Sequence, residues 1–317
     1  MHTRPLPGTD LSLSVLGLGC WAMGGLYWGD DVRDEDSIAT VRAALDLGVN
    51  WFDTAPLYGE GHADAVLARA LGDRRHEVVI ATKVGVRARG RHGHAESDLS
   101  PAHIRADAEA SLRRLGLDCI PLLQIHWPCE RGTPLADSLG ALVRLQEDGL
   151  VRHIGLCNYS AEALREARAL APVVSLQTPL SLLRRAFEGP LQRACVDLGV
   201  GALAYEPLCR GLLTGRYQGA VSFPDTDQRS WDERFQGARL RHGQGLTADL
   251  ARAAARLGVP TAALALGWVI DREGVTAAVV GAKRPAQLRQ SAQADRLVGR
   301  PRVWSVVDRI ASLHGGS

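Results

Sequence analysis

The sequence predicts an α/β protein of the (β/α)8, or TIM-barrel, class, with residues 1–317 forming one domain. Eight short apolar segments alternate with segments in which apolar residues recur at helical spacing. The composition does not change between the two halves of the chain, which argues against two dissimilar domains. The length of 317 residues, 46% of them hydrophobic, is enough for a barrel, which needs about 250 residues.

The predicted strands are mostly uninterrupted apolar runs, as expected for parallel strands that are buried on both faces. In chain order they are 15–19, 50–53, 77–83, 120–126, 153–157, 173–177, 201–205 and 277–281. A doubly wound sheet is the alternative. The segment Leu16-Gly17-Leu18-Gly19 lacks the third glycine of a GxGxxG motif, however, and no helix opens directly behind it.

The segments between the strands carry signals for the beginning and end of helices. Ser100-Pro101 and Thr133-Pro134 each place a hydroxyl side chain before proline, which predicts an N-cap followed by the first helical residue. Glycines that favour helix termination follow the periodic segments at Gly48, Gly116, Gly149, Gly199 and Gly258.

Two further segments are expected at the two ends of the barrel. Residues 1–14 should form a β-hairpin that plugs the bottom. The stretch 216–245 is polar and rich in glycine, aspartate and arginine. Its length predicts a loop that covers the substrate on the C-terminal face.

The composition excludes several classes of partner. The net charge is only +2, from 37 basic and 35 acidic residues, so no nucleic-acid partner is expected. Six cysteines without a CxxC pair predict reduced thiols. The uncharged run 11–29 contains five glycines, which favours a strand and a loop over a membrane span. We therefore expect a cytoplasmic protein with no membrane partner; the sequence does not predict its oligomeric state.

Polar side chains lie at the predicted C-terminal ends of successive strands, the edge at which such barrels carry their active sites. Asp53 ends the second strand, Lys83 the third and His126 the fourth, and Tyr58 follows the second strand closely. Taken singly, Asp53 could be a helix N-cap, His126 a core histidine and Tyr58 pocket lining. Together, an acid, an ammonium and an imidazole near one phenol indicate a site for proton transfer.

Lysine usage supports the importance of Lys83. Only two of the 37 basic residues are lysines, Lys83 and Lys283, and the other 35 are arginines. A chain that otherwise uses arginine is expected to keep lysine where a compact charge is required. The alternatives are a buried structural ion pair for Lys83 and chance for Lys283.

Five segments match a known family in order and spacing: NWFDTAPLYGEGHADAVLARAL, VVIATKVG, LLQIHWP, VRHIGLCNYS and LAYEPLCRGLLTGRY. With them the chain resembles the aldo-keto reductases from about Val15 to Ala294. The resemblance implies a barrel that transfers hydride between NADPH and a carbonyl without a metal. It places the family's catalytic tetrad on Asp53, Tyr58, Lys83 and His126. In these roles Tyr58 is the general acid, Lys83 lowers the pKa of its phenol, Asp53 holds Lys83, and His126 orients the substrate.

The same resemblance implies the cofactor contacts. Asn158 and Gln177 match positions that bind the carboxamide, and Tyr205 matches the aromatic residue that stacks on the nicotinamide. Lys283, with backbone N–H groups at a helix start, is expected to bind the ribose phosphate and so to favour NADPH over NADH. The full set of expected cofactor residues is Trp21, Asn158, Gln177, Tyr205, Leu208, Gly211, Leu212, Gly281, Lys283, Gln287 and Ser291.

Two surface features receive provisional interpretations. Tyr27, Trp28 and Trp127 are expected to line an aromatic substrate pocket that favours an apolar or ring-bearing carbonyl, with ordinary packing as the alternative. The basic segment 87–94 is interpreted as a mobile rim loop, because it lacks the interleaved aromatic residues of a nucleic-acid site. Its two histidines have no evident third ligand, so no metal is expected.

Two functions remain for a chain of this kind. The first is an NADPH-dependent enzyme that reduces a carbonyl compound, or oxidises the alcohol in reverse. The second is a cofactor-binding regulatory subunit on the same fold, in which turnover is incidental. The lack of an N-terminal extension for gating favours the enzyme. The sequence does not name the carbonyl substrate or the physiological direction.

Overall fold

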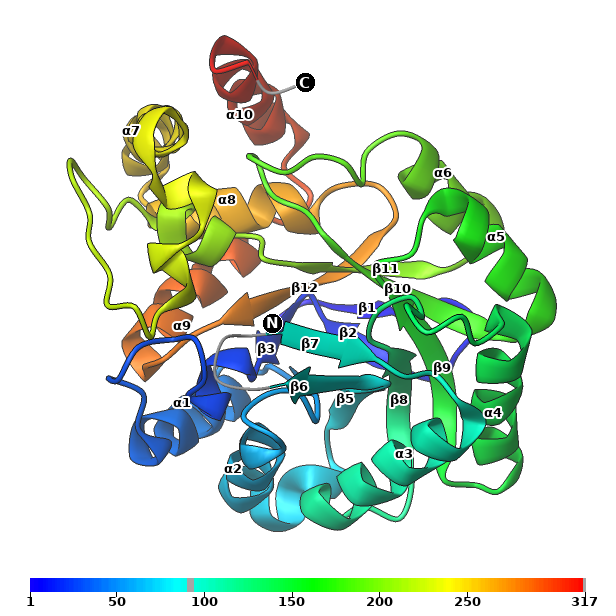
Figure 1. Ribbon diagram of the computed structural model, residues 1–317. Coiled ribbons are helices and arrows are strands. Elements are labelled where there is room, and N and C mark those ends of the chain that lie inside the picture. The colour runs from blue at the N-terminus through cyan, green and yellow to red at the C-terminus, as the bar shows by residue number, and fades with distance from the viewer. Residues whose placement is uncertain (90–93, 316–317) are drawn as a thin grey trace.

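The computed structural model describes residues 1–89 and 94–315, and it contains a closed barrel of eight parallel strands (Figure 1). Strand β12 pairs with β3 and so completes the ring. Going around the barrel, the strands are β3 (Leu16–Gly19), β4 (Trp51–Asp53), β5 (Val79–Val84), β8 (Ile120–Ile125), β9 (Val151–Cys157), β10 (Val173–Pro179), β11 (Gly201–Tyr205) and β12 (Val275–Gly281). All eight predicted strands are confirmed.

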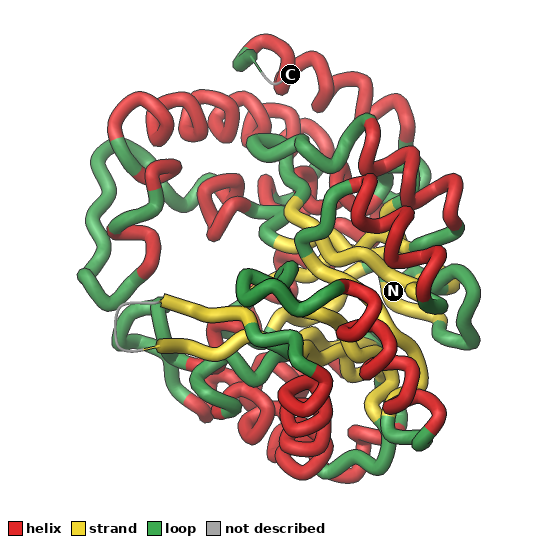
Figure 2. The backbone as a smooth tube through the Cα atoms, turned by 45° about the vertical axis from the view of Figure 1, so that its right-hand side comes forward, coloured by secondary structure: helices red, strands yellow, loops and turns green. Residues whose placement is uncertain are grey.

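Helices surround the barrel on the outside (Figure 2). They are α1 (Asp34–Asp46), α2 (His62–Leu71), α3 (Pro101–Leu115), α4 (Leu135–Glu147), α5 (Ala161–Leu170), α6 (Pro190–Leu198), α7 (Gly237–Leu257), α8 (Thr261–Ile270), α9 (Pro285–Ala292) and α10 (Pro301–Leu313). Gly116, Gly199 and Gly258 end α3, α6 and α7 with φ of 65°, 62° and 64°. Because this left-handed conformation strains other residues, glycine marks these helix ends in the sequence.

The two predicted N-caps differ from expectation. Helix α3 does begin after Ser100, but the Ser100 side chain makes no capping hydrogen bond. Helix α4 begins at Leu135, so the prediction that Thr133 caps it is wrong. The backbone of Pro134 is still extended, with ψ 142°, and its carbonyl accepts from the N–H groups of Asp137 and Ser138. Pro134 is therefore the cap residue rather than the first residue of the helix.

The N-terminal hairpin closes the bottom of the barrel as predicted. Strands β1 (Thr3–Pro5) and β2 (Ser12–Ser14) are antiparallel, with Thr3 opposite Ser14. Leu6 and Leu13 are fully buried and form one apolar cluster with Trp51 and other side chains from the barrel strands. This cluster fills the lower interior and leaves the strand ends on the other face for the site.

Long segments follow the C-terminal ends of the strands. After β11 come the short helices η3 (Cys209–Thr214), η4 (Gln228–Ser230) and η5 (Glu233–Phe235), within a loop that arches away from the barrel (Figure 2). The predicted loop 216–245 is too long, since α7 already begins at Gly237. A Cβ atom at Gly243 would lie 2.6 Å from Leu212 Cδ2, so glycine serves close packing there and not flexibility.

The basic segment after β5 is only partly described. It begins in β6 (Val86–Arg89), which pairs with β7 (His94–Ser97) as an antiparallel hairpin. Residues 90–93, at the centre of the predicted rim loop, lie outside the described residues.

Within the described part of the chain, no single helix has the length and hydropathy to cross a membrane. Only α7 and α8 taken together reach that length and composition, and the break between them is bent by 94°. Every residue of α8 from Ala262 to Ile270 is buried in the protein core.

Candidate active site

A buried ion pair lies where the neighbouring barrel strands β4 and β5 end. The Lys83 ammonium at the end of β5 donates to both carboxylate oxygens of Asp53, at 2.8 and 2.7 Å. It also donates to the Thr54 carbonyl at 3.0 Å and contacts the Tyr58 hydroxyl at 3.3 Å. Gln177, on β10 across the barrel, donates to Asp53 Oδ1 at 2.6 Å. Side-chain exposure is 1% for Lys83 and 3% for Asp53, so water does not screen this pair.

Two glycines allow the Tyr58 loop to approach the segment after β3. A Cβ atom at Gly24 would lie 2.6 Å from the Tyr58 carbonyl carbon, and one at Gly59 would lie 2.3 Å from the Gly24 carbonyl oxygen. The backbones are therefore in direct contact. This contact places Trp21, at the start of η1 (Trp21–Gly24), in a stacked arrangement on Tyr58 with ring centroids 6.2 Å apart.

His126 and a polar chain complete the floor of the site. The His126 ring meets the Tyr58 ring edge-on, with centroids 6.0 Å apart. The Asn158 side chain donates to the His126 carbonyl at 3.0 Å and accepts from the Tyr205 hydroxyl at 2.8 Å. Asn158 has φ 66°, which an asparagine tolerates better than most residues. The four predicted catalytic side chains are thus brought together.

Burial prevails in setting the pKa values of Tyr58 and His126, whereas the Asp53 carboxylate prevails for Lys83. Burial raises the pKa of the Tyr58 phenol above its usual value, although the charge of Lys83 opposes the rise. Burial alone would lower the pKa of Lys83, but the Asp53 carboxylate outweighs it and the pKa is raised. Burial and the charge of Lys83 lower the pKa of His126 well below its usual value. At neutral pH Lys83 is therefore charged, while Tyr58 and His126 are neutral.

Lys83 does lower the pKa of Tyr58, as expected, but burial outweighs this effect and the net pKa is raised. Asp53 neutralises much of the field of Lys83, and its own charge adds to the rise. The phenol keeps its proton, and Lys83 lies where it stabilises negative charge that develops on the oxygen.

A cavity of about 1240 Å³ opens above these residues. Asp53, Tyr58 and His126 line its floor, whereas Lys83 lies beneath. Most residues expected to contact the cofactor also line the cavity, namely Trp21, Asn158, Gln177, Tyr205, Leu208, Gly211, Gly281, Lys283, Gln287 and Ser291. The cavity thus connects the acid–base groups with cationic side chains and a helix start, which fits an elongated, anionic dinucleotide. Among the described residues, Leu212 does not line it, because that side chain is buried against α7.

The contacts of Lys283 differ from those predicted. Its ammonium donates to Asp31 Oδ1 at 2.6 Å and to the Trp28 carbonyl at 2.5 Å. The backbone N–H groups of Lys283 and Arg284 both donate to Gln287 Oε1, at 2.8 and 3.1 Å. The expectation of free N–H groups at this helix start is therefore wrong, because the Gln287 side chain caps α9.

Two of the three aromatic residues expected at the substrate pocket line the cavity. Among the residues that the structure describes, Trp28 and Trp127 line the cavity, whereas Tyr27 does not. Tyr27 instead packs edge-on against Trp231 with centroids 6.2 Å apart, and its carbonyl accepts from the Gln228 N–H. It joins two loops at the outer rim.

Sequence reasoning missed several charged residues of the cavity wall. Arg184 and Arg229 line the cavity, and so does Arg210, whose guanidinium lies 5.4 Å from the centre of the Trp21 ring. No motif indicated them, because arginine is common throughout this chain. Only the position of Arg184 shortly after a predicted strand end could have suggested it.

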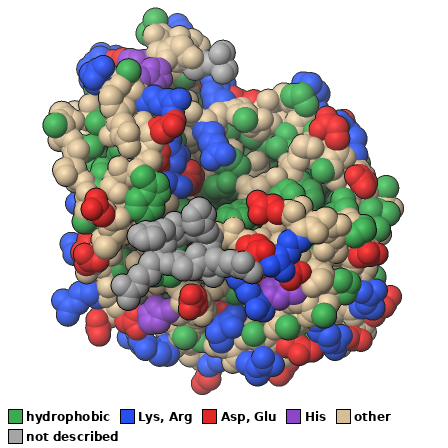
Figure 3. Space-filling view, viewed as in Figure 1, with side chains coloured by type: hydrophobic (Ala, Val, Ile, Leu, Met, Phe, Trp, Pro, Cys, Tyr) green, Lys and Arg blue, Asp and Glu red, His purple; other side chains and the backbone are tan. Residues whose placement is uncertain are grey.

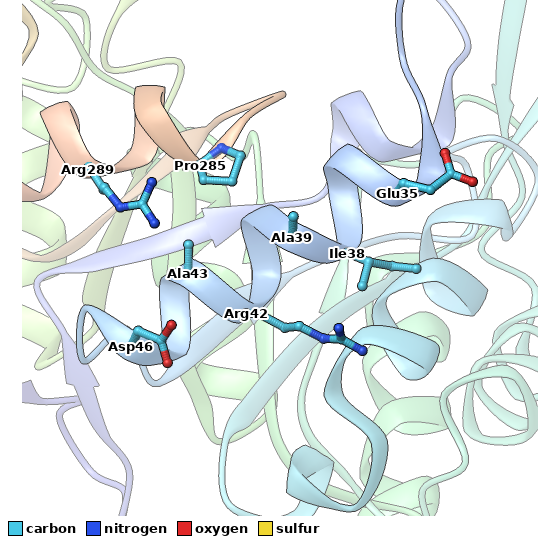
Figure 4. A pocket seen from close by; sticks show the side chains of 8 residues that line it. All are labelled: Glu35, Ile38, Ala39, Arg42, Ala43, Asp46, Pro285 and Arg289. Carbon is cyan, nitrogen blue, oxygen red and sulfur yellow. The ribbon is translucent and has the colours of Figure 1, made fainter.

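A second hollow, of about 580 Å³, lies on the outside between α1 and α9 (Figure 4). It contains none of the four acid–base residues, and its lining consists of Glu35, Ile38, Ala39, Arg42, Ala43, Asp46, Pro285 and Arg289. Within the described ranges, no three His, Cys, Asp or Glu side chains gather as metal ligands. The cavity above Tyr58 is the candidate active site.

The strand ends of this barrel bring together Asp53, Tyr58, Lys83 and His126. This fold and this set of residues are those expected from the resemblance to the aldo-keto reductases, a class of oxidoreductases. Residues 15–311 match the family model of the aldo/keto reductase family. The chain is 34% identical to the aldo-keto reductase YhdN of Bacillus subtilis, over 91% of this chain and 87% of that protein. It is 33% identical to the NADH-specific methylglyoxal reductase of Escherichia coli, over 93% of both. The structure is similar to that of the glycerol dehydrogenase AKR11B4 from Gluconobacter oxydans, with a TM-score of 0.90 and 35% sequence identity. The match covers 99% of this chain and 96% of the dehydrogenase chain.

The protein belongs to the aldo/keto reductase family. It is an NAD(P)H-dependent enzyme, and its substrates are small-molecule carbonyl compounds.

Proposed function

We propose that the protein reduces an aldehyde or ketone to the alcohol, with NADPH as the hydride donor and Tyr58 as the general acid. The observation that carries this proposal is the buried Lys83–Asp53 pair against the Tyr58 hydroxyl at the floor of the cavity. When bound, the cofactor supplies hydride to the carbonyl carbon. The protein's own residues supply the proton and hold the carbonyl oxygen.

In this mechanism Tyr58 donates its proton to the carbonyl oxygen. The phenolate that remains is stabilised by the Lys83 ammonium, 3.3 Å away in the ground state. Asp53 keeps Lys83 charged and fixed, since it accepts two hydrogen bonds from it. The neutral His126 imidazole has one N–H with which to hold the carbonyl oxygen beside Tyr58.

The cofactor roles follow from the lining of the cavity. We assign the carboxamide to Asn158 and Gln177, and the nicotinamide face to Tyr205, whose ring is held by its hydrogen bond to Asn158. Leu208 and Gly211 would lie along the phosphates, and Ser291 at the adenosine end. The aromatic walls formed by Trp28 and Trp127 favour apolar or ring-bearing carbonyls. We place the reaction in the cytoplasm, where six unpaired cysteines would remain reduced.

The preference for NADPH rests on the two cations at the far rim. Lys283 is paired with Asp31, but the Asp31 side chain is 63% exposed and can leave when a phosphate binds. Arg284, 3.7 Å from Asp36 and 61% exposed, adds a second charge at that end. We expect Lys283→Ala to weaken NADPH binding about tenfold and to leave NADH binding nearly unchanged.

Titration of both cofactors against the wild type and Lys283→Ala, followed by turnover with a panel of aldehydes and ketones, tests the proposal. Carbonyl-dependent oxidation of NADPH is the expected result. Absence of turnover with any carbonyl would indicate the regulatory, cofactor-binding alternative. A wild-type preference for NADH, or equal weakening of both cofactors in the variant, would show that Lys283 does not recognise the phosphate.

A further inference from the structure

Four charged side chains on the β11 side of the cavity form a compensated network. Glu206 accepts from Arg210 at 2.8 Å and from Arg234, also at 2.8 Å. Asp232 accepts from Arg210 at 3.0 Å and from Arg234 at 2.7 Å. Two carboxylates therefore face two guanidiniums, and the network carries no net charge. It ties η5 to the segment after β11.

Arg184 adds a fifth, uncompensated charge to this group. Its nearest carboxylate oxygen, Glu206 Oε2, lies 3.8 Å away and already accepts from Arg234. The Arg184 side chain is 49% exposed, compared with 19% for Arg210 and 24% for Arg234. Since both carboxylates already accept from Arg210 and Arg234, the Arg184 guanidinium is a surplus positive charge in this group of five side chains. It lines the cavity.

The backbone of Arg184 is held firmly at the rim. Arg184 and Ser181 exchange two backbone hydrogen bonds, at 3.0 and 3.1 Å, in the turn that follows β10. The Ser181 hydroxyl in turn contacts the Cys209 sulfur at 2.9 Å. The guanidinium therefore starts from a fixed point, and only its side chain has to be ordered when a ligand binds.

Arg184 lies at the catalytic end of the cavity. Its guanidinium lies 3.8 Å from the carboxylate of Glu206, the residue that directly follows Tyr205 at the end of β11. The Tyr205 hydroxyl is linked through Asn158 to the backbone of His126. Lys283 and Arg284 provide the cations at the other end. In Figure 3, Lys and Arg side chains gather along the upper edge of the central hollow.

We propose that Arg184 is a specificity residue that selects carbonyl substrates bearing a carboxylate. The inference rests on the proposed function and narrows its substrate class to oxo acids, whose apolar part would lie against the aromatic walls. A carboxylate would form a charge-assisted pair with the guanidinium that a neutral analogue of the same shape cannot form. A phosphate of the cofactor is the other anion that could meet Arg184, and the experiment separates the two.

The test compares two matched substrate pairs, 4-carboxybenzaldehyde with 4-formylbenzamide and 4-oxobutanoate with 4-oxobutanamide. The ratio of kcat/KM for acid over amide is measured in the wild type, Arg184→Gln and Arg184→Lys. We expect the wild type to prefer the acid in at least one pair. In the glutamine variant that ratio should fall only about tenfold, because solvent screens a half-exposed charge. In the lysine variant it should fall much less, because lysine keeps the positive charge.

Arg193→Gln is the matched control. It removes the same charge from the exposed face of α6. Arg193 is not among the described residues that line the cavity. Turnover of the amides in Arg184→Gln shows that the acid–base chemistry is intact, so failure of this proposal is distinguishable from failure of the proposed function. An unchanged ratio in both pairs would overturn the proposal. So would a rise confined to the Kd of NADPH, which would assign Arg184 to the cofactor.

Discussion

Lys83 contacts Asp53, Thr54 and Tyr58 at once, and each contact was predictable from sequence to a different degree. The strand-end positions and the scarcity of lysine indicated that Lys83, Asp53 and Tyr58 would meet. The direction of the net shift in the pKa of Tyr58 was not predictable, because it depends on how deeply the phenol is buried and how fully Asp53 compensates the charge of Lys83. Neither quantity is encoded in the spacing of residues along the chain.

These protonation states predict the pH dependence of reduction. The pKa of Tyr58 is raised, so the acid keeps its proton throughout the neutral and mildly alkaline range. The pKa of His126 is lowered, so its imidazole stays neutral down to acidic pH. We expect kcat for reduction to be flat from about pH 6.5 to 9, because Tyr58 titrates above this range and His126 titrates below it.

Stopped-flow measurement of hydride transfer at saturating cofactor checks this profile. A limb near pH 6.5 that disappears in His126→Gln would show that the imidazole is not neutral. A loss of rate above pH 8 would show that Tyr58 titrates lower than its burial requires.

At the level of elements, the strands were predictable because parallel strands buried on both faces are continuous apolar runs. Helix boundaries were harder. The start of α4 depends on the backbone conformation of Pro134, and Gly243 lies inside α7, packed closely against Leu212. Both features depend on local geometry or on neighbours distant in sequence, whereas the polar composition of 216–245, rich in glycine, aspartate and arginine, predicted a loop there.

The contact between η1 and the Tyr58 loop provides a prediction at this scale. Gly24→Ala would place a methyl group 2.6 Å from the Tyr58 backbone, so the loop must move. We expect a loss of about 1–3 kcal/mol in stability and at least a tenfold fall in kcat, because the acid is displaced from the substrate.

Gly140→Ala in α4 is the control, since the nearest atom to its Cβ would be the end of the Arg144 side chain at 3.4 Å. That change should stabilise the helix by about 0.5–1 kcal/mol and leave kcat unchanged. Chemical denaturation and steady-state kinetics on both variants make the comparison. An unaltered kcat in Gly24→Ala would contradict the role assigned to this contact.

For the whole molecule, the lower apolar cluster and the candidate active site lie at opposite ends of the barrel. The bottom is filled by the hairpin and its apolar cluster, and the acid–base residues lie at the opposite face. The hairpin was predictable as a plug, whereas the pairing of Lys283 with Asp31 was not, because these residues are distant in sequence and meet only in the folded barrel. We propose that residues 1–317 unfold as one unit.

Leu13→Ala tests this separation. Leu13 is fully buried in the lower cluster, so its truncation should cost about 2–5 kcal/mol in the free energy of unfolding. The kcat/KM at low temperature should stay near that of the wild type. Calorimetry should show a single transition at a lower Tm. Two separate transitions, or a selective loss of kcat with unchanged Tm, would contradict one folding unit with a purely structural lower face.

If Tyr58 protonates the carbonyl oxygen, its replacement by phenylalanine must lower kcat. The variant removes the phenol hydroxyl and keeps the ring that packs against Trp21 and His126. Removal of a general acid typically costs on the order of 10²–10⁴ in rate. We predict a fall of that size in kcat, with the Kd of NADPH, followed by its fluorescence, close to that of the wild type. Turnover near the wild-type rate with normal cofactor binding would contradict the mechanism.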